Sequence, residues 1–240
     1  MTQQEKLFFK EEGFLVIEPF LTKGEVQFYS EIYNDFLNNK FDTSELRSDL
    51  SGANDKSMEL ITQIMLPSKV QPNLLNHPMH KKATEIAKLL MGDDIVLDFD
   101  MLINKPPKTN KQTPWHQDAA YWIDLPDKRA LSLWFAIDES TLNNGCMWYT
   151  PKSHLKPLKK HFQPVGGGSL QCEGTEQDSV AAPLQPGSCV IHQGHTLHYS
   201  RGNTTSHHRR AFILNFRPRK MVELERAQGL DHSGKRKVRT

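Results

Sequence analysis

Cysteine is scarce in this chain, with only Cys146, Cys172 and Cys189 among its 240 residues. The three cysteines lie far apart and form no CxxC pair. This spacing argues against a disulfide framework and against a zinc ribbon. It is typical of a protein from a reducing compartment.

Long hydrophobic runs are also missing. The longest, residues 130–137, contains Ser132 and falls well short of the ~18 apolar residues that a membrane span needs. The N-terminal sequence MTQQEKLFFKEEG lacks the apolar core of a signal peptide. These absences predict a cytoplasmic protein without a membrane partner.

A large excess of one charge is absent as well, because the net charge is only +2. Residues 231–240 carry four cations and one anion, so the rest of the chain has a net charge of −1. A basic chain end is usually solvated, and we therefore expect no nucleic-acid partner. Hydrophobic residues make up 37% and charged residues 24%, which excludes a disordered or coiled-coil chain and indicates a soluble globular domain.

The first part of the chain, residues 1–92, is expected to hold supporting helices and one strand. The apolar run 14–17 predicts the strand. A capping-box pair, Thr22 and Glu25, then begins a helix whose apolar face continues to Phe36. A second helix is predicted from His77-Pro78 to Gly92, with proline early and glycine at its end.

From residue 93 onward the apolar period shortens to that of strands. The expected strands are 95–104, 115–122, 130–138, 146–149, 188–192, 197–200 and 211–216. No long helix separates them, which favours an all-β sandwich or barrel over a parallel α/β sheet. We predict one domain over residues 1–240, mainly β with supporting helices.

Within that domain, residues 93–218 are expected to form the barrel core and residues 219–240 a C-terminal tail. Two polar stretches, 42–56 and 161–186, are expected to be long loops without structure of their own.

His116 and Asp118 form the first pattern that could carry chemistry. On a strand, side chains at positions i and i+2 leave the same face, so an imidazole and a carboxylate can hold two adjacent corners of one metal ion.

The second pattern lies in residues 191–212, which contain five histidines around Gly202-Asn203. If the turn is centred after Asn203, antiparallel pairing places His198 opposite Arg209, with Ser200 on the face of His198. His192 and His195 compete with His198 as a third ligand, whereas His207 and His208 are expected to be exposed turn residues.

Two histidines and one carboxylate on one face match the ligand set of non-haem Fe(II) oxygenases, which leaves coordination positions open for substrates. Arg209 adds a guanidinium fork suited to the carboxylate of a 2-oxo acid such as 2-oxoglutarate. A cupin-like metalloenzyme using zinc or manganese is an alternative, because divalent metal affinities overlap. A non-catalytic binding protein on the same scaffold is another.

These residues resemble the phytanoyl-CoA dioxygenase family of Fe(II)/2-oxoglutarate oxygenases. The likeness includes His116-Gln117-Asp118 and His198, followed by Ser200, Asn203 and Arg209 at offsets of two, five and eleven. Further landmarks follow in order: EGFLV at 12–16, NKPP at 104–107, LWFAID at 133–138, NGC at 144–146 and PKSH at 151–154. One departure is Lys152, where the family's loop usually has glycine.

The resemblance implies a double-stranded β-helix, the cupin-like jelly-roll barrel. It implies that His116, Asp118 and His198 bind Fe(II). Arg209 and Ser200 would then hold the distal carboxylate of 2-oxoglutarate, and Trp134 would pack against it.

The implied activity is hydroxylation of a C–H bond in a small-molecule substrate, consuming 2-oxoglutarate and O2 and releasing succinate and CO2. The family acts on several substrate classes, and we expect the loops 42–56 and 161–186 to select among them.

Overall fold

A computed structural model of the protein describes residues 1–52, 58–164 and 168–233. Its strands are β1 (Phe14–Ile17), β2 (Arg47–Asp49), β3 (Thr62–Met65), β4 (Ile95–Lys105), β5 (Thr113–His116), β6 (Leu131–Ala136), β7 (Met147–Tyr149), β8 (Val180–Ala182), β9 (Cys189–Gln193), β10 (His198–Ser200) and β11 (Arg209–Pro218). Its α-helices are α1 (Gln3–Glu12), α2 (Lys23–Leu37), α3 (Pro67–Val70), α4 (Pro78–Met91) and α5 (Arg219–Ala227). Short 3-10 helices are η1 (Pro72–Asn76), η2 (Asp118–Tyr121), η3 (Ser153–Leu155) and η4 (Glu176–Asp178). None of these described helices is long and apolar enough to span a bilayer.

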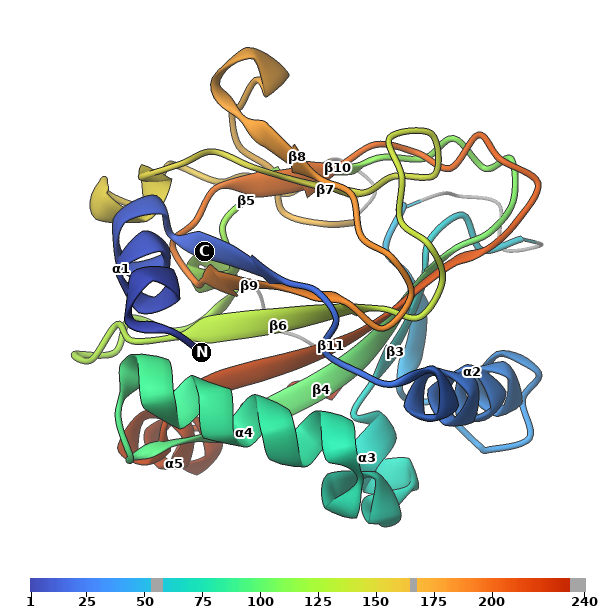
Figure 1. Ribbon diagram of the computed structural model, residues 1–240, viewed down its shortest axis with the longest axis horizontal. Helices are drawn as coiled ribbons and strands as arrows, with labels where there is room; N and C mark the ends of the chain where they lie inside the picture. Colours follow the sequence, from blue (N-terminus) through green and yellow to red (C-terminus); the bar gives the residue numbers. More distant parts are fainter. Residues whose placement is uncertain (53–57, 165–167, 234–240) are drawn as a thin grey trace.

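The strands form two sheets that face each other (Figure 1). The larger sheet has seven strands in the order β1-β9-β6-β11-β4-β3-β2, and the smaller has four in the order β5-β10-β7-β8. Neighbouring strands are antiparallel and mostly distant in sequence, as in a jelly roll. The predicted double-stranded β-helix is confirmed.

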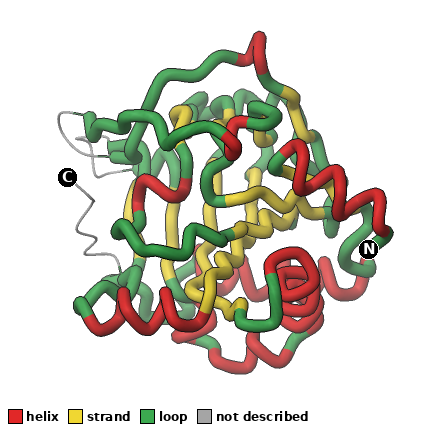
Figure 2. The backbone as a smooth tube through the Cα atoms, turned by 90° about the vertical axis from the view of Figure 1, so that its left-hand side faces the viewer, coloured by secondary structure: helices red, strands yellow, loops and turns green. Residues whose placement is uncertain are grey.

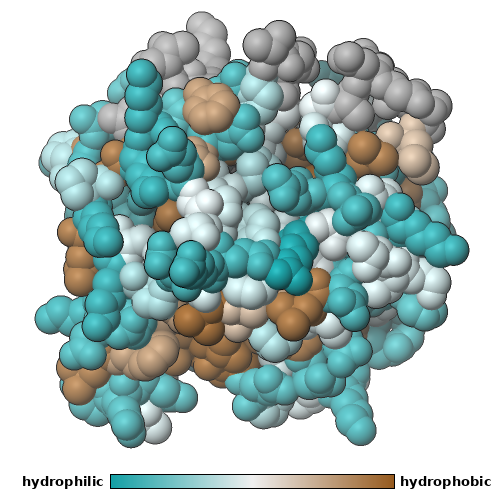
Figure 3. Space-filling view, turned by 90° about the horizontal axis from the view of Figure 1, so that it is seen from above, coloured by the Kyte–Doolittle hydropathy of each residue, from teal (hydrophilic) through white to brown (hydrophobic). Residues whose placement is uncertain are grey.

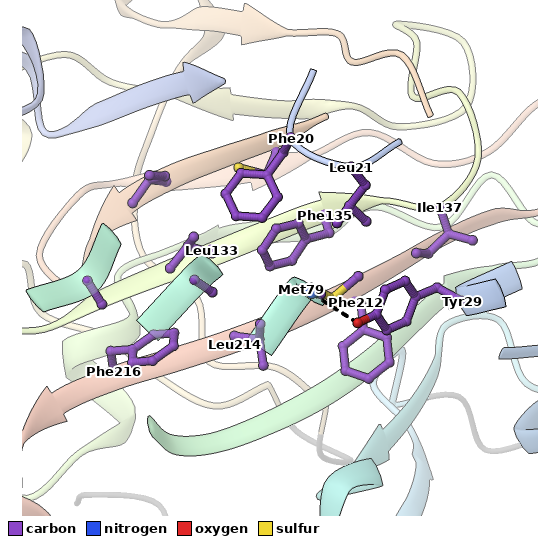
Figure 4. Close-up of a cluster of buried hydrophobic side chains, with 14 of the residues drawn as sticks. Phe20, Leu21, Tyr29, Met79, Leu133, Phe135, Ile137, Phe212, Leu214 and Phe216 are labelled. Atoms are coloured by element: carbon purple, nitrogen blue, oxygen red, sulfur yellow. Dashed lines mark hydrogen bonds between the residues drawn. The ribbon is translucent and has the colours of Figure 1, made fainter. Parts of the chain in front are cut away.

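Helices cover the outer face of the larger sheet, as Figures 1 and 2 show from two directions. The alternation along β11 explains this arrangement, because Phe212, Leu214 and Phe216 join the core beneath the helices while Ala211 and Ile213 join the core between the sheets. Figure 4 shows the helix-side core, including a hydrogen bond that links α2 to α4. On the opposite side of the molecule, over the smaller sheet, hydrophilic residues predominate (Figure 3).

The alternation also sets the inner face of β11. Arg209 begins the strand and Asn215 lies six residues later, both buried on the same side as Ala211 and Ile213. The long strand therefore brings charged and amide side chains into the space between the two sheets.

The N-terminal part contains more structure than expected. Helix α1 was not predicted, although Thr2 and Glu5 form a capping box at its start. Strands β2 and β3 join the larger sheet from a region where only one strand was expected. The helix beginning at Thr22 and the helix ending at Gly92 are both confirmed.

The two long loops are partly ordered. The loop at 42–56 contains β2, and the loop at 161–186 contains η4 and β8, which pairs with β7. Residues 53–57 and 165–167 lie outside the described residues.

The predicted pairing of residue 198 with residue 209 is wrong. Strand β10 pairs with β5 and β7, whereas β11 pairs with β4 and β6, so His198 and Arg209 lie in opposite sheets. Asn203 explains the difference, because its amide donates to the carbonyls of Lys105 and His207 and so holds an open connection between the sheets instead of a tight hairpin.

The segment 219–240 does not begin as a tail, because α5 packs against β4 and β11. Arg217 donates to the carboxylates of Asp98 and Glu225, and His232 Nε2 lies 2.9 Å from a Glu225 oxygen. Arg226 also pairs with Asp98. We call these five buried or half-buried residues the C-terminal clasp.

The clasp is an ion-pair network in character. Its Asp98, Glu225 and His232 lie close enough to hold a metal, but the guanidinium of Arg217 already contacts both carboxylates. Burial would raise the pKa of Asp98, yet His232 and the two arginines lower it to about 2. The basic residues 234–240 lie outside the described residues.

Candidate active site

Three side chains predicted as metal ligands meet between the sheets. Antiparallel pairing of β5 with β10 places His116 opposite His198. Asp118 Oδ1 lies 3.8 Å from His116 Nε2 and 3.7 Å from His198 Nε2. All three ligand atoms lie within 4.8 Å of one another, a spacing at which they could hold one metal ion.

The route by which Asp118 reaches this place differs from the prediction. The expected strand 115–122 ends at His116, and Asp118 is the first residue of the 3-10 helix η2. The proposed same-face strand geometry for His116 and Asp118 is therefore wrong. The turn after Gln117 brings the carboxylate to the imidazole instead.

Both histidines are oriented by backbone carbonyls. His116 Nδ1 lies 2.7 Å from the carbonyl of Pro114, and His198 Nδ1 lies 2.8 Å from that of Thr196. With Nδ1 donating, each Nε2 carries the lone pair toward Asp118. Burial lowers the pKa of both imidazoles, so both are neutral at pH 7, as metal ligation requires.

Two side chains hold the second oxygen of Asp118. Ser132 Oγ donates to Oδ2 over 2.7 Å, and His192 Nε2 lies 3.1 Å from the same oxygen. Tyr149 Oη lies 3.3 Å from His192 Nδ1 and can donate to it. Oδ1 is thereby left to face His116 and His198.

Burial alone would raise the pKa of Asp118, but the hydrogen bond from His192 and the neighbouring histidines bring it well below its usual range. The carboxylate is therefore ionised. His192 lies behind Asp118 and outside the three-residue group, and His195 lines a separate pocket with Trp122. Ser132 was not predicted from the sequence, which offers no signal for it.

Arg209 lies in the same interior and has an unusual environment. It is 1% exposed, and its Nε and Nη1 have no hydrogen-bond partner among the described residues. The indole of Trp134 lies 5.1 Å from its guanidinium carbon. Burial lowers the pKa of Arg209 to about 10, which leaves it charged at neutral pH.

Lys105 is a second buried basic side chain and lies opposite Arg209 on the neighbouring strand. Its Nζ donates to the carbonyls of Ser200, Arg201 and Lys111. Burial and the charge of Arg209 lower the pKa of Lys105 well below its usual range. Arg209 has no carboxylate partner among the described residues, which makes this end of the interior suited to an anion.

Ser200 follows His198 on β10 and is buried. It contributes its carbonyl to Lys105, and it makes no hydrogen bond to Arg209 in the described structure. The structure thus brings His116, Asp118 and His198 together, and places Arg209 beside Trp134.

A pocket lined by His116 and Asp118 opens beside the three candidate ligands and has a volume of about 70 Å³. The two long loops meet at this pocket. Leu50 and Ser169 both line it, and Ser169 donates to the carbonyl of Leu50 from both its amide and its hydroxyl. Tyr121 Oη accepts a hydrogen bond from the amide of Leu170. Both loops expected to select the substrate therefore reach this pocket.

Comparison with known proteins shows the family of the chain. The family model described as phytanoyl-CoA dioxygenase matches residues 9–211. The chain belongs to the phytanoyl-CoA dioxygenase family. Among its relatives in this family, peroxisomal phytanoyl-CoA dioxygenase from Bos taurus is 26% identical over 231 residues, which cover 90% of this chain and 68% of the relative. The resemblance predicted from the sequence is confirmed.

Solved structures related to this dioxygenase family extend the comparison. EvdO2 from Micromonospora carbonacea var. aurantiaca has a TM-score of 0.77 and 30% identity, with 92% of this chain and 96% of that chain covered. EvdO2 complexed with 2-oxoglutarate has a TM-score of 0.76 and 29% identity over the same shares of the two chains. The chain is an Fe(II)/2-oxoglutarate-dependent dioxygenase by family and by fold.

Proposed function

We propose that this dioxygenase hydroxylates a C–H bond of a small-molecule substrate, with His116, Asp118 and His198 holding Fe(II). In this proposal Arg209 and Ser200 bind the distal carboxylate of 2-oxoglutarate, and Trp134 packs against the co-substrate. Bound Fe(II) and 2-oxoglutarate supply the oxidising power, consuming O2 and releasing succinate and CO2.

Arg209 is the observation that carries the proposal. A guanidinium that is buried and unpaired is unfavourable unless an anion completes its hydrogen bonds. Arg209 lies in the same interior as a group of two neutral imidazoles and one carboxylate. This combination fits a metal together with a dicarboxylate that chelates it at one end.

The protein's own residues would fix the geometry of the reaction. His116 and His198 present their Nε2 lone pairs, and Asp118 presents Oδ1 because its other oxygen is already hydrogen-bonded. Trp134 and Arg209 would set the direction in which the co-substrate extends. No protein acid or base is needed for hydrogen abstraction in this scheme.

The alternatives fit the site less well. A zinc or manganese enzyme of the cupin type has no use for an unpaired buried arginine beside its metal. A non-catalytic binding protein has no need for a complete set of two histidines and one carboxylate. Arg209 and the intact set thus favour the oxygenase.

An anaerobic titration tests the proposal directly. Metal-free protein is given Fe(II) and then 2-oxoglutarate, and the weak visible charge-transfer band of a chelated iron–keto-acid complex is recorded. We expect the band to appear, and succinate to form once O2 is admitted. Metal binding without any band would overturn the oxygenase reading and favour the zinc or manganese enzyme.

The contact between His192 and Asp118 leads to a second expectation about metal binding. Replacing His192 with leucine removes the hydrogen bond to Asp118 Oδ2. We expect Fe(II) affinity to fall about tenfold or more, as for other residues that orient a ligand from behind. Anaerobic Fe(II) titration of the metal-free protein measures this.

His192→Gln keeps a donor and should retain most of the affinity. His207→Leu serves as the control, since that histidine is exposed on the connection between the sheets. Equal losses in the leucine and glutamine variants would show that His192 acts through packing alone.

A further inference from the structure

The interior between the two sheets has a second half, away from Arg209, and the pocket beside the candidate ligands lies in that half. Inward-facing residues of β11 advance by ~3.4 Å per residue, so Arg209 and Asn215 lie roughly 20 Å apart along the strand. The inward-facing residues of β6 lie at the same two ends: Trp134 stacks on Arg209, whereas Ser132 pairs with Asn215. A co-substrate that extends toward Arg209 therefore leaves the Asn215 end to another ligand.

Asn215 offers an unsatisfied amide in this second half. It is 1% exposed and lines the pocket together with His116 and Asp118. Its Oδ1 lies 2.6 Å from Ser132 Oγ, and its Nδ2 has no partner among the described residues.

The Ser132 hydroxyl has a single proton, which Asp118 Oδ2 can take. Turning the amide over would then satisfy Ser132 with Nδ2 and leave Oδ1 free. In either orientation one buried amide atom lacks a partner. A ligand hydroxyl can satisfy either atom, because it both donates and accepts.

The lining of this half is otherwise neutral. Apart from the candidate metal ligands, the pocket lining contains no charged side chain among the described residues. Nearby Arg217 is already paired with Asp98 and Glu225. An anionic group on a ligand here would be desolvated without a cationic side chain to receive it. The lining therefore favours an uncharged ligand.

Two aromatic rings bound the pocket at the clasp end. Phe99 stacks on His232 with ring centroids 4.1 Å apart, and the Arg217 guanidinium lies 5.0 Å from the centroid of Trp122. Clasp residues therefore pack against both rings and close this end of the pocket. The enclosed space is small, which favours a compact ligand over a long acyl chain.

We propose that this pocket binds the primary substrate, and that it selects an uncharged, hydroxyl-bearing ring such as a cyclic polyol or a glycoside. Asn215 would hydrogen-bond a ring hydroxyl, and Phe99 and Trp122 would pack against the ring. The inference rests on the proposed oxygenase function. Asn215 and most of the clasp lie beyond residue 211, where the family match ends, so they can give this chain a selectivity of its own.

The test uses the full chain loaded anaerobically with Fe(II) and 2-oxoglutarate. Three probes are compared by their effect on the visible band and on tryptophan fluorescence: methyl glucoside, glucuronate and 1-octanol. We expect methyl glucoside to bind, and glucuronate and octanol to bind at least about tenfold more weakly. Octanol or glucuronate binding as tightly as the glucoside, or no binding of the glucoside, overturns the inference.

The variant Asn215→Leu keeps the side-chain size but removes the amide. It should lose about tenfold or more in glucoside affinity while its 2-oxoglutarate band persists, which shows that the rest of the site is intact. Asn143→Leu, at an exposed loop position, is the control. Unchanged glucoside binding in Asn215→Leu also overturns the inference. A wild-type protein that forms no band at all overturns the proposed function, and this inference with it.

Discussion

Replacing Asp118 with alanine is expected to abolish succinate formation and to weaken Fe(II) binding by more than about 100-fold. The change removes the only anionic member of the three-residue group and leaves two neutral imidazoles. It also removes the acceptor of hydrogen bonds from Ser132 and His192. Anaerobic Fe(II) titration and a succinate assay measure the two effects.

Asp118→Asn is tested alongside the alanine variant. It keeps the side-chain shape, so a loss of activity in both variants would not be explained by a folding defect. It should also fail, since its amide lacks the negative charge. Asp178→Ala is the control, because Asp178 is exposed on η4. Turnover retained in both Asp118 variants would sink the assignment of this carboxylate as a metal ligand.

The grouping of His116, Asp118 and His198 could be predicted because the pattern depends on offsets along the chain. His116 and Asp118 are two apart, and Ser200, Asn203 and Arg209 follow His198 at fixed distances. A pattern of offsets remains useful even when the predicted secondary structure around it is wrong. Asp118 reaches the imidazoles from a 3-10 helix instead of a strand, yet its carboxylate still arrives within 4 Å of both.

The fold was predictable where the apolar periodicity is strong. It was not predictable where polar contacts between distant residues determine the path of the chain. Asn203 opens the connection between residues 198 and 209 through hydrogen bonds to distant carbonyls, which a local pattern does not reveal. Helix α5 has the sequence RKMVELERA, and it is held by Arg217 and Asp98 from other elements. Its place depends on contacts that form only after the barrel has closed.

The backbone conformation at Lys152 explains why the family's loop usually has glycine there. The residue has φ of 61°, a left-handed conformation in which glycine is the least strained residue. Lysine thus occupies a backbone position that suits the glycine of the family's loop. Its ammonium lies 3.4 Å from a Glu12 carboxylate oxygen.

Arg209→Ala is expected to raise the Kd for 2-oxoglutarate by about 100-fold, the loss of two charge-assisted hydrogen bonds. Fe(II) affinity should stay within about twofold, because Arg209 is not part of the three-residue group. The anaerobic visible band, followed against 2-oxoglutarate concentration, measures the Kd. Arg209→Lys should recover only part of the affinity, since an ammonium lacks the planar fork that matches a carboxylate.

Pyruvate sharpens this test because it is a 2-oxo acid without a distal carboxylate. The wild-type protein should prefer 2-oxoglutarate strongly over pyruvate, and Arg209→Ala should show little preference between them. Arg210→Ala is a matched control, since the neighbouring arginine pairs with Asp138 and hydrogen-bonds α2 on the opposite face of β11. A wild-type preference for 2-oxoglutarate that survives in Arg209→Ala would show that another group receives the distal carboxylate.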